Sequence, residues 1–327
     1  MIPKPRGLRC TLPARRNSNS TGVHARTLQW SERMGFAPDA RALKKISKIQ
    51  VDDIAARTYP TADPDLLQLT SDMLTWFFVS DDQYDERQLG ASPQKLKKIF
   101  ANFVRILESG SRRLAISPLG AALLDLRERL TQRADSVWLT RFTASMSLYF
   151  HGCLQEAENR QAQLTPEFDE YCQIRRASVG TYPCFDLFEL AMKQRCPEAL
   201  IQAPALAALR DLATDAVAWI NDIVSYQKES SFSDPHNMIS VLMNDCGISQ
   251  AEACDKTVEI INEQLDSFIH LAGKARTPQD AAENEYIEGL ESWIRGVYDW
   301  SFTSERYSSE YVKLSQQATH ILVNEEV

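Results

Sequence analysis

The chain has 327 residues, enough for one large domain or two ordinary ones with a sizeable core. Its formal net charge of −8 argues against nucleic acid as the main partner. No apolar run approaches the ~20 residues that a membrane-spanning helix needs. The seven cysteines include no Cys-x-x-Cys pair, which indicates reduced thiols in a cytoplasmic protein and not a disulfide or zinc framework.

The first 26 residues differ in composition from the rest of the chain. They contain six Lys or Arg residues, three prolines and no acid, since the first acidic residue is Glu32. This composition predicts a disordered basic tail over residues 1–26. A segment that folds over an anionic ligand and, less well, an organelle address are the alternatives. We expect a folded domain over residues 27–310 and a C-terminal tail over residues 311–327.

The remainder of the chain has helical patterns throughout. Glycine is scarce, at 12 residues, and long segments are rich in Ala, Leu, Glu, Gln and Arg. No stretch alternates as a strand would, so the sequence predicts one all-α domain of about ten helices. A helix capped by Asp63 with Pro64 at its first position should run into Asp81-Asp82. The helix dipole disfavours acids at that end, and a bound metal would compensate them.

A second group of oxygen ligands lies on the helix predicted from Pro204 to Lys228. Asn221, Ser225 and Glu229 recur every four residues, which stacks an amide oxygen, a hydroxyl and a carboxylate on one face. Hard cations prefer oxygen ligands, and Mg²⁺ is the usual ion beside a phosphate substrate. The triplet alone could equally be the wet side of an amphipathic helix. The acidic cluster at residues 81–86 favours the metal site.

A predicted helix break adds a third feature. Gly180 and Pro183 interrupt the helix that carries Arg175 and Arg176, and such a break frees backbone carbonyls. Arginine binds phosphate through two parallel hydrogen bonds. His236 has no partner at metal-ligand spacing, so we interpret it as structural. The aromatic residues near these features, whose π faces attract cations, are Trp76, Phe77, Phe78, Tyr182, Phe185, Tyr298 and Trp300.

Metals at the mouth of a cavity with aromatics behind them suit one reaction. The ions would assist departure of diphosphate from an allylic carbon, and the closed cavity would shelter the resulting carbocation. From about His24 to Tyr307 the chain resembles the microbial class I terpene synthases, in four ordered motifs. These are the aspartate-rich motif at Asp81, Asp82 and Asp85, the second metal motif from Asn221 to Glu229, the diphosphate-sensing Arg175 and the C-terminal pair Arg306-Tyr307.

The resemblance implies a single antiparallel α-helical bundle and a set of roles. Asp81 would bind two of three Mg²⁺ ions, Asp82 and Asp85 would act less directly or through water, and Mn²⁺ could substitute. The third ion would be bound by Asn221, Ser225 and Glu229. The diphosphate would be held by Arg175, Lys228, Arg306 and Tyr307. Ser178 matches the linker position, and the carbonyl facing the carbocation would come from Val179 or Gly180.

The cavity wall is expected to include Phe77, Phe78 and Trp300. For Trp300 a core role is the alternative. Ser80 departs from the family pattern, because many relatives have Phe before the aspartates, and Phe77 or Phe78 would then serve instead.

The resemblance implies a terpene hydrocarbon or alcohol as product, formed by a carbon–oxygen lyase. Farnesyl diphosphate is the favoured substrate, which would make the product a sesquiterpene; geranylgeranyl and geranyl diphosphate are the alternatives. A chain-elongating prenyltransferase carries two aspartate-rich motifs, so the Asn/Ser/Glu motif argues against that activity. A noncatalytic helical scaffold would not need all four motifs. Product identity and the choice between monomer and homodimer are left open.

Overall fold

The computed structural model describes residues 3–85, 92–231 and 234–316. Within these ranges the chain forms α-helices and three short 3₁₀ helices, and no strand. The expected all-α fold is confirmed. The helices are α1 Val23–Arg33, α2 Ala40–Ile49, α3 Val51–Thr58, α4 Pro64–Asp85, α5 Pro93–Ser109, α6 Pro118–Thr131, α7 Ser136–Ala162, α8 Phe168–Ser178, α9 Thr181–Phe188, α10 Glu198–Ile201, α11 Pro204–Ser231, α12 Met238–Cys246, α13 Gln250–Ala275, α14 Ala281–Ser301 and α15 Ser309–Gln316.

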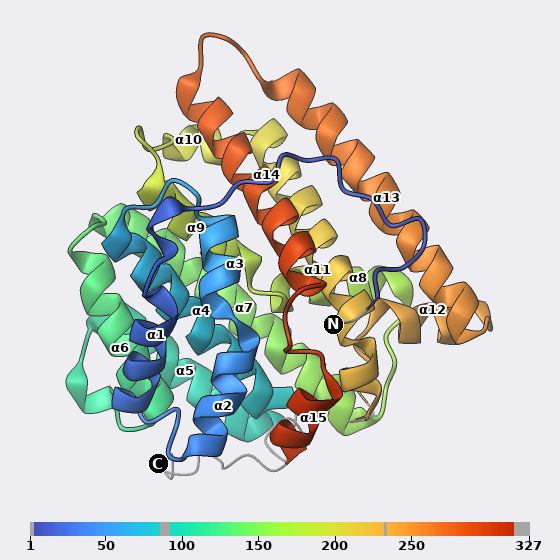
Figure 1. Cartoon of the computed structure of the whole chain (residues 1–327), viewed down its shortest axis with the longest axis horizontal. Helices are drawn as coiled ribbons and strands as arrows, with labels where there is room; N and C mark the ends of the chain where they lie inside the picture. The colour runs from blue at the N-terminus through green and yellow to red at the C-terminus, as the bar shows by residue number, and fades with distance from the viewer. Residues whose placement is uncertain (1–2, 86–91, 232–233, 317–327) are drawn as a thin grey trace.

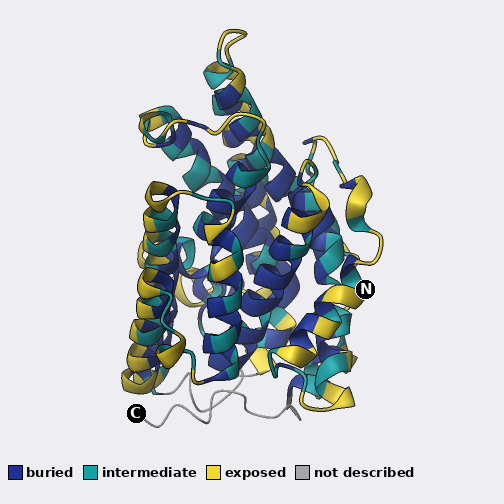
Figure 2. Cartoon of the chain, turned by 90° about the vertical axis from the view of Figure 1, so that its left-hand side faces the viewer, coloured by how far each residue is buried: buried dark blue, intermediate teal, exposed yellow. Residues whose placement is uncertain are grey.

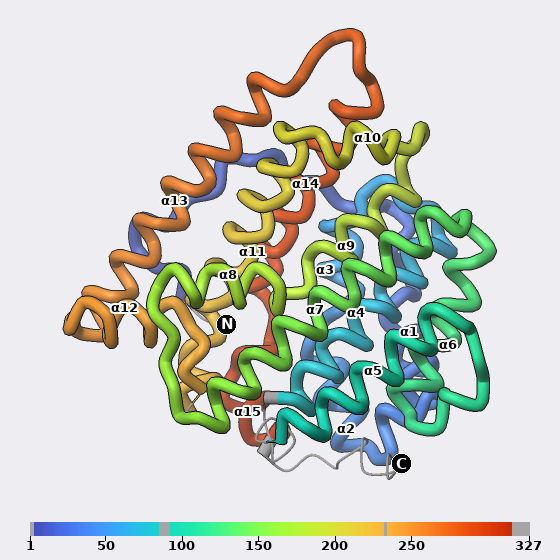
Figure 3. Tube along the Cα trace, turned by 180° about the vertical axis from the view of Figure 1, so that it is seen from behind, coloured from blue at the N-terminus to red at the C-terminus, as the bar shows by residue number. Residues whose placement is uncertain are grey.

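The helices pack side by side in one bundle (Figure 1). On one side α11 packs against α13 and α14, α14 packs against α3, and α3 packs against α4. On the other side, seen from behind in Figure 3, α7 packs against α5, α8 and α9. The inward helix faces are buried and the outward faces are exposed (Figure 2). Side chains of α4, α8 and α11, which carry three of the four predicted motifs, line one cavity in this arrangement.

Local signals in the sequence explain where the site helices begin. Asp63 Oδ1 accepts a hydrogen bond from the Leu66 backbone N–H at 3.0 Å, and α4 begins at Pro64 as predicted. Asp135 caps α7 in the same way, accepting from the Trp138 backbone N–H at 2.9 Å. Because a cap depends only on neighbouring residues, the sequence pattern located the start of α4 correctly.

The predicted helix break is confirmed between α8 and α9. Gly180 has φ of 73°, in the left-handed region that glycine adopts without a steric penalty. A Cβ at this position would lie 3.3 Å from the Tyr149 ring, which leaves little room for a side chain. Pro183 occupies the first turn of α9, where a missing backbone N–H costs no intrahelical hydrogen bond. Gly180 therefore makes the break, and Pro183 follows it.

The N-terminal segment differs from the expected disordered tail. The N-terminal segment crosses α13 and α14 (Figure 1), its residues 18–20 then pack against α3 and α4, and α1 begins at Val23. Leu8 and Leu12 are buried, and Arg9 forms an ion pair with Asp266 of α13. The Arg295 guanidinium of α14 donates to the Leu12 carbonyl at 2.6 Å. The prediction failed because these partners lie more than 250 residues away in the sequence.

The C-terminal boundary drawn at residue 310 also differs from the structure. It falls inside α15, and Tyr311 is fully buried with its hydroxyl donating to Asp82 Oδ2 at 2.5 Å. Residues 311–316 therefore belong to the bundle, and residues 317–327 lie outside the described ranges. No two of the seven cysteines are joined by a disulfide in the described structure. None of the helices in the described part combines the length and apolarity needed to cross a bilayer.

Candidate active site

A cavity of about 130 Å³ lies at the centre of the bundle, between α3, α4, α7, α8, α9, α11 and α14. Most of the predicted site residues lie on its wall. They are Phe77, Phe78, Asp81, Arg175, Ser178, Val179, Gly180, Asn221, Ser225, Lys228, Glu229, Trp300, Arg306 and Tyr307. Asp82 is not on this wall, and the side chain of Asp85, the last residue of α4, lies outside the described part, as does Glu86.

The oxygen-bearing face of α11 points into the cavity. Asn221 Oδ1 accepts a hydrogen bond from Arg175 Nη2, and Asn221 Nδ2 donates to the Tyr307 hydroxyl, both at 2.7 Å. Ser225 Oγ is buried and meets no hydrogen-bond partner in the described chain, although its hydroxyl lies near enough to Glu229 to lower the pKa of that carboxyl. Desolvation has the larger effect and raises the pKa of Glu229, while the Arg175 charge opposes it.

These three side chains fit a hard cation. Burial of the Glu229 carboxylate is costly even though Asn237 Nδ2 donates to its Oε2 at 2.8 Å. The buried Ser225 oxygen accepts no hydrogen bond from the described residues. A divalent ion would satisfy both, and the amide oxygen of Asn221 is a third ligand of the same hard type. Within the described ranges there is no group of three or more His, Cys, Asp or Glu side chains that could hold a metal ion. The α11 face offers one carboxylate together with two neutral oxygens.

Asp81 and Asp82, at the end of α4, have different surroundings. The Asp81 side chain is 43% exposed and forms an ion pair with Arg306 at 2.7 Å. Asp82 is buried, and its carboxylate meets Lys45 at 2.8 Å, Lys228 at 2.9 Å and Arg306 at 3.1 Å. Burial opposes its charge, but these three cations outweigh that effect and hold the pKa of Asp82 well below its ordinary value.

The compensation expected from a metal is therefore supplied to Asp82 by the protein itself. Lys228, expected on the diphosphate, lies on the cavity wall and also pairs with Asp82. Neither Lys45 nor Tyr311 was singled out from the sequence. Lys45 comes from α2 and Tyr311 from α15, so no short motif could have placed them beside Asp82.

Arg175 and Arg176 point in different directions from α8. Arg175 Nε donates to Asp222 Oδ1 at 3.0 Å, and its side chain reaches the cavity. Asp222 is fully buried and also accepts from the Met238 backbone N–H at 2.9 Å, so it is a fixed support for the guanidinium. Arg176 instead makes a bidentate pair with Asp215, at 2.8 and 2.7 Å. Of the two arginines, Arg175 faces the site.

Comparison with known proteins agrees with this geometry. Residues 72–267 match the family model described as terpene synthase family 2, C-terminal metal binding. Germacrene A synthase of Nostoc punctiforme is 34% identical over 92% of this chain and 94% of its own length. The chain belongs to the terpene synthase family.

Other relatives agree with this assignment. The (+)-T-muurolol synthase of Roseiflexus castenholzii is 34% identical over 88% of each chain. The crystal structure of a-eudesmol synthase superposes with a TM-score of 0.79 at 26% identity, covering 91% of this chain and 99% of that one. An ancestral reconstruction, the SVS_A2 protein, gives a TM-score of 0.84 at 26% identity over 90% of this chain and 89% of that one. The protein is a class I terpene synthase with the all-α fold of these enzymes.

Aromatic side chains form much of the remaining wall of this terpene synthase. The Phe78 and Trp300 rings lie 5.3 Å apart between centroids, and Trp300 meets Tyr307 edge-on at 6.0 Å. Phe77 meets Tyr149 edge-on at 5.2 Å. Tyr149 and Trp293 also line the cavity, whereas Trp76, Tyr182, Phe185 and Tyr298 are not on its wall. Ser80 is fully buried and lies off the wall as well.

Two further wall residues were missed or assigned only a structural role. Glu156 of α7 accepts a hydrogen bond from the Ser178 hydroxyl and lines the cavity of the synthase. No spacing signal in the sequence connects these residues, which come from different helices. His236 also reaches the wall, but its ring is held by Asp234 at 3.2 Å and Asn159 at 3.1 Å. These contacts agree with the structural interpretation of His236.

Proposed function

We propose that this terpene synthase ionises farnesyl diphosphate with Mg²⁺ and cyclises the carbocation to a sesquiterpene. The observation that carries the proposal is one cavity whose wall combines hard oxygen ligands, cationic side chains and aromatic rings. The choice of farnesyl diphosphate rests on relatives. The (+)-T-muurolol synthase is described as cyclising (2E,6E)-farnesyl diphosphate, and it is 34% identical to this chain.

The ions would be held by side chains from two helices. Asp81 would bind them from α4, with Asp82 and Asp85 in the less direct roles that the motif implies. Asn221, Ser225 and Glu229 would bind from α11. When bound, Mg²⁺ neutralises the diphosphate and makes it a better leaving group. We expect three ions, with Mn²⁺ as a substitute.

Cationic side chains would hold the departing diphosphate. Arg175 is supported by Asp222 and presents a planar guanidinium suited to two phosphate oxygens. Arg306 lies on the cavity wall, where it already pairs with Asp81. Lys228 and Tyr307 lie on the same wall. Held from several sides, the diphosphate leaves in a fixed direction, and the carbocation forms facing the aromatic rings.

The helix break would supply one carbonyl to this carbocation. In a continuous helix the Val179 carbonyl would accept from the N–H of residue 183, but residue 183 is proline and has none. The Val179 oxygen is thus left free of that bond at a residue on the cavity wall. Gly180 carries the left-handed turn, and Ser178 links the break to Arg175 in sequence. Phe77, Phe78 and Trp300 would stabilise the cation through their π faces.

Incubation with each of three diphosphates and Mg²⁺ tests the proposal. We expect farnesyl diphosphate to give a cyclic fifteen-carbon product by gas chromatography with mass detection. Geranyl and geranylgeranyl diphosphate should show a lower kcat/KM for diphosphate release. A clear preference for either of these would replace the proposed substrate and leave the reaction class intact.

A further inference from the structure

The backbone carbonyl of Ile49, at the end of α2, has no acceptor role within its own helix and can accept hydrogen bonds from side chains near the cavity wall. Gln50 adopts φ 57° and ψ 50°, a left-handed conformation that ends α2 at Ile49. The Asp53 backbone N–H, which would bond Ile49 in a continuous helix, bonds the Gln50 carbonyl at 3.0 Å instead. Ile49 is fully buried, so its carbonyl needs a donor from another part of the chain.

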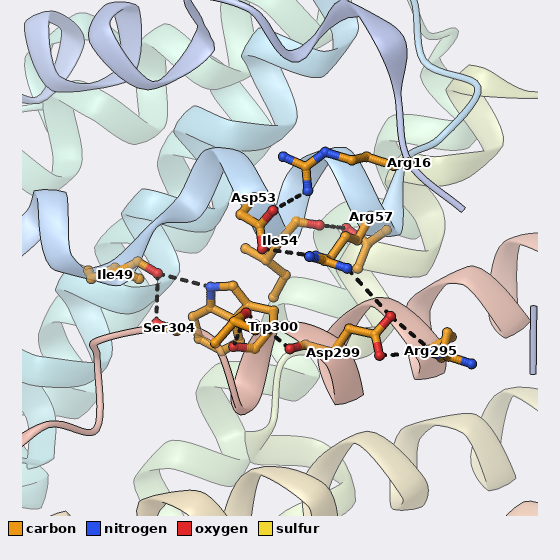
Figure 4. A network of polar contacts seen from close by, with 11 residues as sticks. Arg16, Ile49, Asp53, Ile54, Arg57, Arg295, Asp299, Trp300 and Ser304 are labelled. Carbon is orange, nitrogen blue, oxygen red and sulfur yellow. Dashed lines mark hydrogen bonds and ion pairs between the residues drawn. The ribbon is translucent and has the colours of Figure 1, made fainter. Parts of the chain in front are cut away.

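Two side chains at the end of α14 provide those donors. Trp300 Nε1 donates to the Ile49 carbonyl at 2.9 Å, and Ser304 Oγ donates to the same oxygen at 3.0 Å (Figure 4). The same end of α14 is also tied to α3, because Arg57 pairs with Asp299 at 3.4 Å. The Trp300 ring is therefore held from behind while another side of it lines the cavity.

The Ser304 hydroxyl, which donates to Ile49, also accepts a hydrogen bond from Arg306. A hydroxyl can donate one hydrogen bond and accept others, and Ser304 Oγ accepts from the Arg306 backbone N–H at 3.1 Å. The Arg306 guanidinium then lies 4.5 Å from the Phe78 ring centroid and pairs with Asp81. Phe78 in turn packs against Trp300. These contacts link Ile49, Ser304, Arg306, Phe78 and Trp300 in a ring, which the hydrogen bond from Trp300 to the Ile49 carbonyl closes.

We propose that Ser304 is a positioning residue that fixes Arg306 at the cavity mouth relative to the Trp300 wall. The inference rests on the proposed function, since it concerns where the diphosphate is held when the carbocation meets the aromatic rings. Removing the hydroxyl leaves the Arg306 backbone N–H without its acceptor and the Ile49 carbonyl with one donor. Arg306 and Trp300 can then shift relative to one another.

The expected consequence is a change in chemistry more than in substrate binding. For Ser304→Ala we expect kcat for diphosphate release to fall roughly tenfold, which corresponds to about 1.4 kcal/mol. KM should stay within about threefold, because Arg175 and the metal ligands are untouched. The product mixture should shift towards linear or less cyclised compounds, because the carbocation would form in a different position relative to the Trp300 ring.

Ser301→Ala is the matched control. Ser301 is the last residue of α14, three residues before Ser304; it is buried, and its Oγ has no hydrogen-bond partner in the described residues. We expect this variant to keep wild-type kinetics and products. Ser304→Thr keeps a hydroxyl on the same carbon and should lie closer to wild type than Ser304→Ala in both measurements.

Kinetics, product profiles and melting temperatures of the four proteins decide the inference. A Ser304→Ala protein that melts lower but keeps wild-type kcat and products overturns it, since that result describes a residue with a packing role only. A product shift as large in Ser301→Ala overturns it too. If wild type releases no diphosphate from any prenyl diphosphate, the proposed function fails and this inference fails with it.

Discussion

Lys228 Nζ lies 2.9 Å from Asp82 Oδ1, so an ion pair joins the helix with the Asn/Ser/Glu motif to the helix with the aspartate-rich motif. Both side chains are about 5% exposed or less. The Asp82 carboxylate also forms ion pairs with Lys45 and Arg306 and accepts a hydrogen bond from the Tyr311 hydroxyl. The two halves of the candidate metal site are therefore held at a set separation before any ion binds. We expect Asp82 to stabilise this arrangement and the adjacent Asp81 to bind the ions.

The first prediction separates those two aspartates. Asp82→Asn leaves three buried cations around a neutral amide, and breaking a buried ion pair typically costs about 3–5 kcal/mol. We expect a clear fall in the free energy of unfolding, measured by urea denaturation. Asp81→Asn, at a side chain that is 43% exposed, should change that free energy by less than ~1 kcal/mol and still remove most turnover. Equal destabilisation by both substitutions would contradict this division.

Arg175 and Arg176 supply a second matched pair. Arg175→Lys keeps the charge but loses the planar fork that faces the cavity, so we expect diphosphate release to fall by ~100-fold or more. Arg176→Lys disturbs a pair with Asp215 away from the cavity and should leave turnover within a few fold. Steady-state kinetics of both variants check this. If Arg176→Lys is the inactive one, the wrong arginine has been assigned to the diphosphate.

Trp300 lines the cavity and is anchored at the same time. Replacing it with Phe removes the hydrogen bond to the Ile49 carbonyl and weakens the π face. Cation–π contacts are worth about 2 kcal/mol when desolvated, or roughly a 30-fold bias between competing steps. We expect Trp300→Phe to retain diphosphate release and to shift products towards less cyclised compounds. Trp138→Phe, at a buried tryptophan off the cavity wall, is the control that should change stability without changing products.

Glu189 provides a prediction about pH. Burial raises the pKa of Glu189 to about 8 from an ordinary 4.5. Its ion pair with Arg141 does not prevent this rise, because Arg141 also forms ion pairs with Asp186 and Glu198. Below pH 4.5 the folded and unfolded chains both hold this proton. Between 4.5 and about 8 the unfolded chain releases it first, so stability is lost as pH rises through this window.

Glu189→Gln removes that titration. The stability of the variant relative to wild type should therefore improve between pH 5 and 8 by on the order of a few kcal/mol. Urea denaturation at several pH values measures this difference, and groups common to both proteins cancel. Parallel stability curves for the two proteins would show that Glu189 is ionised throughout.

Features set by neighbouring residues could be predicted from the sequence. Asp63 and Pro64 located the start of α4, Gly180 located the helix break, and the four-residue spacing identified side chains of α11 that share the cavity wall. Each depends on helix geometry over one or two turns. The family resemblance added the pairing of these motifs across the bundle.

Features set by distant residues could not be predicted. Asp82 is distinguished from Asp81 by Lys45 and Tyr311, which come from opposite ends of the chain. The N-terminal segment looked like a basic tail, but Arg9 finds Asp266 only after α13 is in place. The anchoring of Trp300 likewise requires the carbonyl left at the end of α2. A sequence pattern shows which groups are present and does not show which of them meet.

The most direct test of the central claim is diphosphate release from farnesyl diphosphate by wild type and Glu229→Gln, across a Mg²⁺ titration. Glu229→Gln removes the one carboxylate of the α11 ligand face and relieves a desolvated charge, so it should melt at or above the wild-type temperature. We predict metal-dependent release by wild type that a chelator abolishes, and release at least ~100-fold slower by the variant at every Mg²⁺ concentration. Normal turnover in metal-free buffer, or wild-type turnover by Glu229→Gln, would contradict the account.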